Sequence, residues 1–371
     1  MDGIGEAIFP YHLPDELVVK IFSLLPPENL VQAKCVGHSW YYHINHLIKD
    51  PSFIAQHLKN SSSTKYIVIR QEQALSLLTM LNNDRGNGEI RYETEDFSSR
   101  FVSRERYARD YYLRYHCNGI FCMHHELLRV FTLFNPSIKE LRKLPPPSIT
   151  DCWHPGIVGF GYDQRTNDYK IINIALDRFL SSRAEVYRMS SDSWMEIELP
   201  VETPCAAEAR FTAYCQGVFY CESSSETTNM LVSFDMSEEV FRTILFPQDR
   251  LTAETSFECV NVWNESLTLF LSNKDRPLSI EMWVLNTLDS TWYRHLTFER
   301  QFINVRPFKF HTDDELVMMS SIGGNSDGEE PLISYACYNI NSQRFRPLIN
   351  VEGAIEYWDF SFTKSLVPVE Q

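Results

Sequence analysis

The chain has 371 residues, with 34 lysines and arginines against 49 aspartates and glutamates, which gives a formal net charge of −15. Such acidity argues against binding nucleic acid, because affinity for phosphates depends on clustered lysine and arginine. With 44% hydrophobic and 22% charged residues, the chain is expected to form one sizeable core plus a small module. No apolar run approaches the ~18 residues of a membrane span, and residues 1–6 lack the basic start of a signal peptide. We expect a cytoplasmic or nuclear protein without a membrane partner, whose nine cysteines stay reduced.

Apolar residues near the N-terminus recur at steps of three and four, the spacing of one helical face. They are Leu13, Leu17, Ile21, Leu24 and Leu25. Pro14 suits the first helical turn, and the pair Pro26-Pro27 ends this helix and can begin the next. A second apolar set predicts further short helices, at Leu30, Ala33, Val36, Trp40, Ile44 and Leu47. A module of this size makes little core alone, so we expect another subunit to cover its apolar face.

This stretch resembles the F-box over residues 11–58. The likeness rests on the Leu-Pro-x-Glu-Leu start, on the apolar run that ends at Pro26, and on Cys35-Val36 and Ser39-Trp40, with departures at Ala33 and at Gly37-His38. The resemblance implies docking on a Skp-type adaptor and, through it, on a cullin-based ubiquitin ligase. The residues that match the adaptor-packing positions of the family are Leu13, Pro14, Leu17, Ile21, Leu25, Pro26, Leu30, Val36 and Trp40. Among them we expect Leu17, Ile21 and Trp40 to contribute most. The alternative is an ordinary helical cap on the following domain.

After a polar segment at residues 59–64, expected to be a linker, the sequence changes to short β-branched and aromatic runs separated by turns. Five eight-residue windows begin and end on an apolar or aromatic residue around a polar turn. They are 134–141, 187–194, 234–241, 285–292 and 338–345, with starts 53, 47, 51 and 53 residues apart. A period near fifty predicts a kelch-like β-propeller, with one four-stranded blade per repeat.

We therefore predict an α+β multidomain chain, with helices at 1–58 and an all-β propeller of about six blades at 65–371. Five or seven blades are the alternatives. The last blade would combine strands from residues 65–100 with a C-terminal strand at 357–362, because closing the ring removes unpaired strand edges. Residues 82–115 carry no visible hairpin window.

The second region resembles the F-box-associated domain of plant F-box proteins, and most of all the S-locus F-box and S-locus F-box-like group. The likeness rests on Phe134-Asn135-Pro136-Ser137, on Gly159-Phe160-Gly161-Tyr162-Asp163 with Asn167-Asp168-Tyr169-Lys170, and on Tyr187 with Trp194. The resemblance implies a substrate-recognition domain. For the S-locus group it implies capture of basic S-ribonucleases in self-incompatibility, which agrees with the acidity of this chain.

Patterns that carry chemistry are weak in this sequence. Cys117, Cys122, His124 and His125, with His116 beside them, lack a second pair at zinc-finger spacing, so we expect strand residues and no metal or other cofactor. No nucleophile motif stands out, and we expect a non-catalytic subunit. The substrate site is unknown, and the loop candidates for it are Arg104, Arg109, Asp327 and Glu329. The alternative function is a propeller that binds glycans or glycoproteins.

Overall fold

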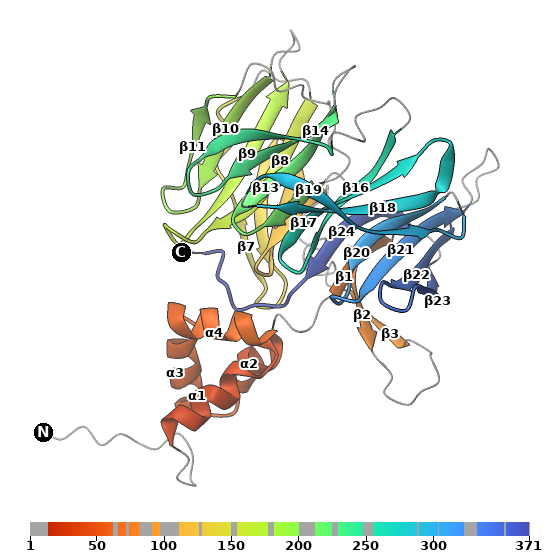
Figure 1. Ribbon diagram of the computed structural model, residues 1–371. Coiled ribbons are helices and arrows are strands. Elements are labelled where there is room, and N and C mark those ends of the chain that lie inside the picture. Colours follow the sequence, from red (N-terminus) through yellow and green to blue (C-terminus); the bar gives the residue numbers. More distant parts are fainter. Residues whose placement is uncertain are drawn as a thin grey trace, which may run out of the picture.

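The computed structural model describes residues 14–61, 66–71, 74–81, 91–96, 111–125, 128–149, 154–176, 182–199, 212–224, 229–247, 255–287, 289–302, 304–322, 332–351 and 354–370. A small helical module precedes a large ring of strands (Figure 1). Its helices are α1 (Asp15–Ser23), α2 (Pro27–Ala33), α3 (His38–Leu47) and α4 (Pro51–Ser61). Proline begins two of them, where the missing N–H removes no helical hydrogen bond. The expected linker is therefore helical for its first three residues, because α4 continues to Ser61.

Five blades are each built from four consecutive antiparallel strands. The first has β4 (Tyr111–Cys117), β5 (Ile120–His125), β6 (Val130–Asn135) and β7 (Glu140–Lys143). The second has β8 (His154–Asp163), β9 (Asp168–Leu176), β10 (Ser182–Arg188) and β11 (Ser193–Ile197). The third has β12 (Thr212–Cys215), β13 (Val218–Ser224), β14 (Asn229–Asp235) and β15 (Val240–Leu245). The fourth has β16 (Thr255–Trp263), β17 (Ser266–Asn273), β18 (Arg276–Asn286) and β19 (Thr291–Glu299). The fifth has β20 (Val305–Phe310), β21 (Glu315–Ile322), β22 (Leu332–Asn339) and β23 (Arg344–Val351).

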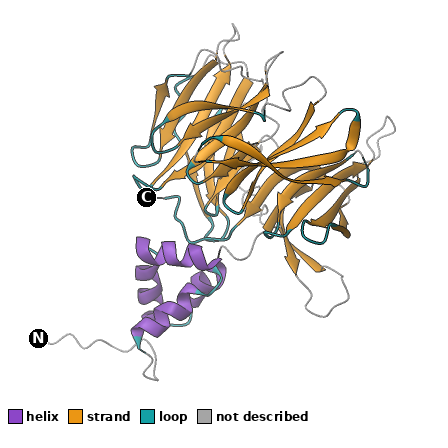
Figure 2. Ribbon diagram, viewed as in Figure 1, coloured by secondary structure: helices purple, strands orange, loops and turns teal. Residues whose placement is uncertain are grey.

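A further four-stranded sheet is composite. It places the C-terminal β24 (Ala354–Phe362) beside β1 (Tyr66–Gln71), followed by β2 (Ala74–Leu81) and β3 (Arg91–Asp96). This is the pairing of C-terminal and early strands that ring closure requires, and β24 contacts both β20 and β4. Among the described residues, the blades built from consecutive strands number five, one fewer than the expected six. The composite sheet is the sixth four-stranded sheet of the ring. Figure 2 shows the strands gathered in the ring and the helices confined to one side of it.

The five hairpin windows are confirmed at the level of single residue pairs. The first and last residues of each window lie directly opposite each other on the last two strands of a blade. The pairs are Phe134 with Leu141, Tyr187 with Trp194, Phe234 with Phe241, Leu285 with Trp292, and Tyr338 with Phe345. Aromatic pairs of this kind place their rings in contact, with centroids 4.8 Å apart for Phe234 and Phe241. Each window therefore holds together the outer hairpin of its blade.

The apolar cores lie between neighbouring blades. Middle strands such as β5 are buried along their whole length, whereas the outer strand β11 is mostly exposed. Tryptophans contribute to these cores: Trp283 is buried, and Trp194, Trp263 and Trp292 are half-buried against core clusters. Burial on both faces favours apolar side chains along a strand, and β5 is apolar over Ile120–Met123 before its two buried histidines.

Candidate functional site

The helical module carries an apolar surface that the chain leaves open. Leu17 and Ile21 on α1 are 47% and 49% exposed, Leu24 after its end is 65% exposed, and Val36 after α2 is 66% exposed. Isolated exposed apolar residues are common, but several gathered on one small module indicate an interaction surface. We call Leu17, Ile21, Leu24 and Val36 the open face.

The other side of the same helix is buried. Val18 and Phe22 on α1 pack with Leu30, Ile44 and Phe53 in the core of the module. Successive helical residues are ~100° apart, so positions 17, 21 and 24 form one stripe and positions 18 and 22 form the next. The chain seals one stripe with its own helices and leaves the other to solvent.

The C-terminal segment joins this module to the ring. We call residues 363–370 the tail. Leu366 of the tail packs into the core of the helical module beside Ile138, while Val367 and Val369 pack in the core of the first two blades. Lys364 forms an ion pair with Glu28 of α2 at 2.7 Å. One short segment therefore contacts both parts of the chain, and Figure 1 shows it passing between them.

Buried polar groups hold the tail in place. The Asn135 side-chain amide lies at the end of β6, is fully buried, and donates to the carbonyl oxygens of Ser365 (3.2 Å) and Val367 (2.8 Å). Ser365 Oγ donates to the carbonyl oxygen of Asn118 at 2.6 Å, and the Glu140 carboxylate accepts from the backbone N–H of Val369 at 2.9 Å. Because unmade hydrogen bonds are costly in a buried site, this set favours one position of the tail.

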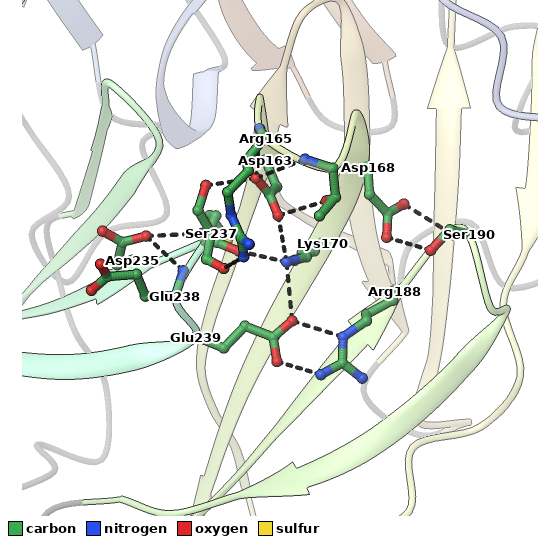
Figure 3. Close-up of polar contacts among 12 residues, drawn as sticks. Asp163, Arg165, Asp168, Lys170, Arg188, Ser190, Asp235, Ser237, Glu238 and Glu239 are labelled. Carbon is green, nitrogen blue, oxygen red and sulfur yellow. Dashed lines mark hydrogen bonds and ion pairs between the residues drawn. The ribbon is translucent and has the colours of Figure 1, made fainter.

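A second polar arrangement links the second and third blades (Figure 3). Lys170 on β9 is buried and forms ion pairs with Asp163 (2.7 Å) and with Glu239 of the next blade (3.0 Å). Glu239 also pairs with Arg188. Burial alone would raise the pKa of Asp163, but hydrogen bonds from Lys170 and from the hydroxyls of Ser237 and Thr166 outweigh it, so the pKa is lowered. The network connects the second blade to the third through buried and half-buried charges.

A family model described as an F-box associated beta propeller domain matches residues 89–369, most of the chain. A second model, described as F-box-like, matches residues 11–53, which include the open face. The chain belongs to the F-box proteins that carry an F-box associated beta propeller. The helical module is thus the F-box and the ring is the propeller.

Three relatives illustrate the likeness, all from Arabidopsis thaliana. F-box/kelch-repeat protein At3g23880 is 27% identical over 262 residues, which cover 67% of this chain and 69% of that protein. F-box protein At3g08750 is 24% identical over 285 residues, or 74% of this chain and 70% of the relative. Putative F-box only protein 9 is 22% identical over 382 residues, or 97% of this chain and 96% of the relative. None of these names refers to the S-locus.

The structure divides the residues at the adaptor-packing positions of the F-box into three groups. Pro14, Leu17, Ile21, Pro26 and Val36 are exposed. Leu25 and Trp40 are half-buried, and the Trp40 ring lies 5.3 Å from that of Phe22, so Trp40 supports the core as well as the surface. Leu30 has no exposed surface and belongs to the F-box core. Leu13 lies outside the described residues. Leu24 was not among the residues matched to the family, but the apolar face predicted from the three- and four-residue spacing included it, and it is 65% exposed.

Helix α4 is tied to the end of α1 by polar contacts that sequence reasoning missed. The His57 ring is fully buried, and its Nε2 donates to the carbonyl oxygen of Leu25 at 2.8 Å. Asn60 donates to the carbonyl oxygen of Ser23 at 3.0 Å. Burial lowers the pKa of His57, which favours the neutral ring. These bonds satisfy carbonyl groups that the end of α1 would otherwise leave without partners.

The remaining predicted residues fall into two sets. The loop candidates for substrate binding, Arg104, Arg109, Asp327 and Glu329, lie outside the described residues. The cysteine and histidine cluster is described in part, with Cys117, Cys122, His124 and His125 all buried. Across the described ranges, no group of three or more His, Cys, Asp or Glu side chains could hold a metal ion. Within those ranges, too, no helix has both the length and the apolar character needed to cross a bilayer.

Proposed function

We propose that this chain is the substrate receptor of an SCF ubiquitin ligase. The F-box binds a Skp-type adaptor and, through it, a cullin, while the propeller captures the protein to be modified. The observation that carries this proposal is the open face, four large apolar residues exposed on a module whose other side is sealed. Burying a large apolar side chain contributes ~1.5–3 kcal/mol, so covering this face favours a stable subunit contact.

The tail contacts support a mechanism based on position. In a cullin-based ligase the conjugating enzyme is carried by another subunit, and the receptor accelerates transfer by holding a substrate lysine close to it. The receptor itself then needs no catalytic residue. Tail residues hydrogen-bond to the propeller and form an ion pair with the F-box, so a captured substrate keeps a defined orientation relative to the adaptor.

For the substrate we propose a basic protein, and in particular an S-ribonuclease. Residues 1–60 hold four lysines and six carboxylates, a net of −2, so the rest of the chain carries −13 of the total −15. A domain of this charge attracts basic partners and increases their rate of association. Capture should weaken as ionic strength rises, because salt screens exposed charges. The assay measures binding of a basic ribonuclease at salt concentrations from about 50 to about 500 mM, over which the Debye length falls from about 14 to about 4 Å. Affinity that does not change over this range would contradict the electrostatic part of the proposal.

Affinity purification of the full-length chain from its source tissue tests the proposal as a whole. The wild-type chain should recover an adaptor, a cullin and a target protein. A chain with Leu17→Ala and Ile21→Ala should lose the adaptor and the cullin together while it retains the target. If the doubly substituted chain still recovers the cullin, the F-box is not the connection to the ligase.

A further inference from the structure

A cavity of about 810 Å³ lies where the F-box meets the propeller. Its walls come from three parts of the chain that are distant in sequence: the F-box (α4 and the ends of α2 and α3), turns and strand ends of the first two blades, and the tail. Apolar side chains dominate these walls, among them Ile54 and Leu58 of α4, Ile138, Met189 and Val367. Pockets for small molecules occur preferentially between domains, have ~300–1,000 Å³, and are mostly apolar with a few polar groups. This cavity meets each of these criteria, and the open face contributes none of its lining residues.

Positive charge gathers on the F-box wall of the cavity. Lys34, Lys49 and Lys59 all line it, in a chain with a net charge of −15. Neither Lys34 nor Lys49 forms an ion pair with a carboxylate in the part of the chain that the structure describes. Burial lowers the pKa of Lys34, an effect that the charge of Glu140 only partly offsets. An ammonium group partly removed from water gains from an anion placed against it.

The two glutamates that line the cavity leave it with one net positive charge. Glu140 already accepts hydrogen bonds from the backbone of the tail, at Val369 N (2.9 Å) and Glu370 N (3.5 Å). The other acidic lining residue is Glu370, which is exposed at the end of the tail. Three lysines against two glutamates make this junction positive while the chain as a whole is strongly negative. Charge complementarity therefore favours an anionic occupant.

Aromatic rings form part of the propeller wall. Tyr162 and Tyr169 line the cavity with their ring centroids 4.9 Å apart, and the Tyr169 hydroxyl accepts a hydrogen bond from Asn118 at 3.0 Å. Burial raises the pKa of both phenols, so they add no negative charge. Aromatic rings and aliphatic side chains of α4 line the same cavity, a combination that suits a ring-containing molecule.

We propose that this cavity binds a small amphipathic anion, an apolar ring system or short chain that carries one anionic group. The anionic group contacts Lys34 and Lys49, and the apolar body lies between α4 and the tyrosine rings. A molecule in this position contacts the F-box, the propeller and the tail at once, so its binding strengthens the junction between the two domains.

Two fluorescent probes that differ only in charge test this assignment on the full-length chain. 8-Anilino-1-naphthalenesulfonate has the expected form, an apolar ring system with one sulfonate. N-phenyl-1-naphthylamine has the same rings without the sulfonate. We expect the anionic probe to bind saturably at one site, with an affinity at least ~10-fold higher than that of the neutral probe, or ~1.4 kcal/mol. Equal affinity of the two probes would overturn the proposal, because the lysines would then contribute nothing.

Substitutions in the cavity separate charge from shape. Lys34→Gln with Lys49→Gln should weaken the anionic probe ~10-fold or more while binding of the neutral probe changes little. Lys274→Gln, with Lys34 and Lys49 intact, removes one positive charge from an exposed turn of the fourth blade and should leave both probes unchanged. Ala55→Trp places a large ring at the exposed Ala55 of α4, should fill the cavity, and should reduce binding of both probes.

Folding and adaptor binding are measured in parallel. Circular dichroism and the thermal midpoint establish whether each variant is folded. If Ala55→Trp does not fold, the variant with Lys34→Gln and Lys49→Gln still tests whether the cavity binds an anion. Leu17→Ala with Ile21→Ala should abolish adaptor binding and leave the anionic probe bound, so a failure of the adaptor proposal is distinguishable from a failure of this one. Fluorescence that does not saturate, or that is the same in the lysine variant, would refute the anion site.

Discussion

The open face gives a quantitative prediction for adaptor affinity. Leu17 and Ile21 are 47% and 49% exposed, so about half of each side chain remains to be buried by a partner. Full burial of such a side chain contributes ~1.5–3 kcal/mol, and half of it therefore contributes ~0.8–1.5 kcal/mol for each residue. Replacing both by alanine should cost ~1.5–3 kcal/mol of binding, a ~10- to 150-fold rise in the Kd for a purified Skp-type adaptor. Isothermal titration calorimetry measures this directly.

A matched control separates the interface from a general effect of truncation. Leu278 on β18 is 40% exposed, similar to the two F-box residues, but belongs to the propeller. Leu278→Ala should leave the adaptor Kd unchanged. Alanine is a good helix former, so the F-box variants should remain helical by circular dichroism. If the double F-box variant binds the adaptor within about twofold of wild type (~0.4 kcal/mol), the open face is not the docking surface.

Four predictions concern the contacts that hold the domains and blades together. Asn135→Ala removes a buried amide that donates to the tail, and a loss of ~1–3 kcal/mol should lower the thermal midpoint; an unchanged midpoint would contradict the role of the tail. Lys170→Met removes the ion pair of the buried Asp163 carboxylate and one of the two cationic partners of Glu239, and should cost roughly 3–5 kcal/mol in urea unfolding. The folded-state pKa of Asp163 lies below its ordinary value of 3.8. Its carboxylate therefore stabilises the fold above about pH 4 and does so less as the pH falls. Asp163→Asn should flatten the acid side of the curve of unfolding free energy against pH. Gly119 and Gly217 both have a positive φ, but only at Gly119 would a new Cβ meet the tail, 2.6 Å from the carbonyl oxygen of Thr363. Gly119→Ala should therefore lower the unfolding free energy more than Gly217→Ala does. Equal losses would show that the tail does not pack against Gly119.

Sequence patterns predicted the hairpins of the propeller down to the paired residues, because that information is local. The two ends of each window are seven residues apart, and a four-residue turn brings them together whatever the rest of the chain does. Tyr187 and Trp194 are such a pair, with ring centroids 5.4 Å apart. The composite sheet has a different basis: it pairs Tyr66 with Phe362, which no local pattern connects, and it was expected only from the requirement that the ring close.

The sequence alone determined that the chain has a short helical module with apolar stripes and a ring of repeated hairpins, since both follow from periodicity over a few residues. Only the tertiary structure decided which of the predicted surface residues the module buries for itself, as it does with Leu30, and that the tail joins the two domains. Asn135 meets Ser365 across 230 positions of sequence, and a contact at that separation depends on the closed ring rather than on any local preference. The cavity at the junction has the same origin, because its walls meet only after both domains have folded.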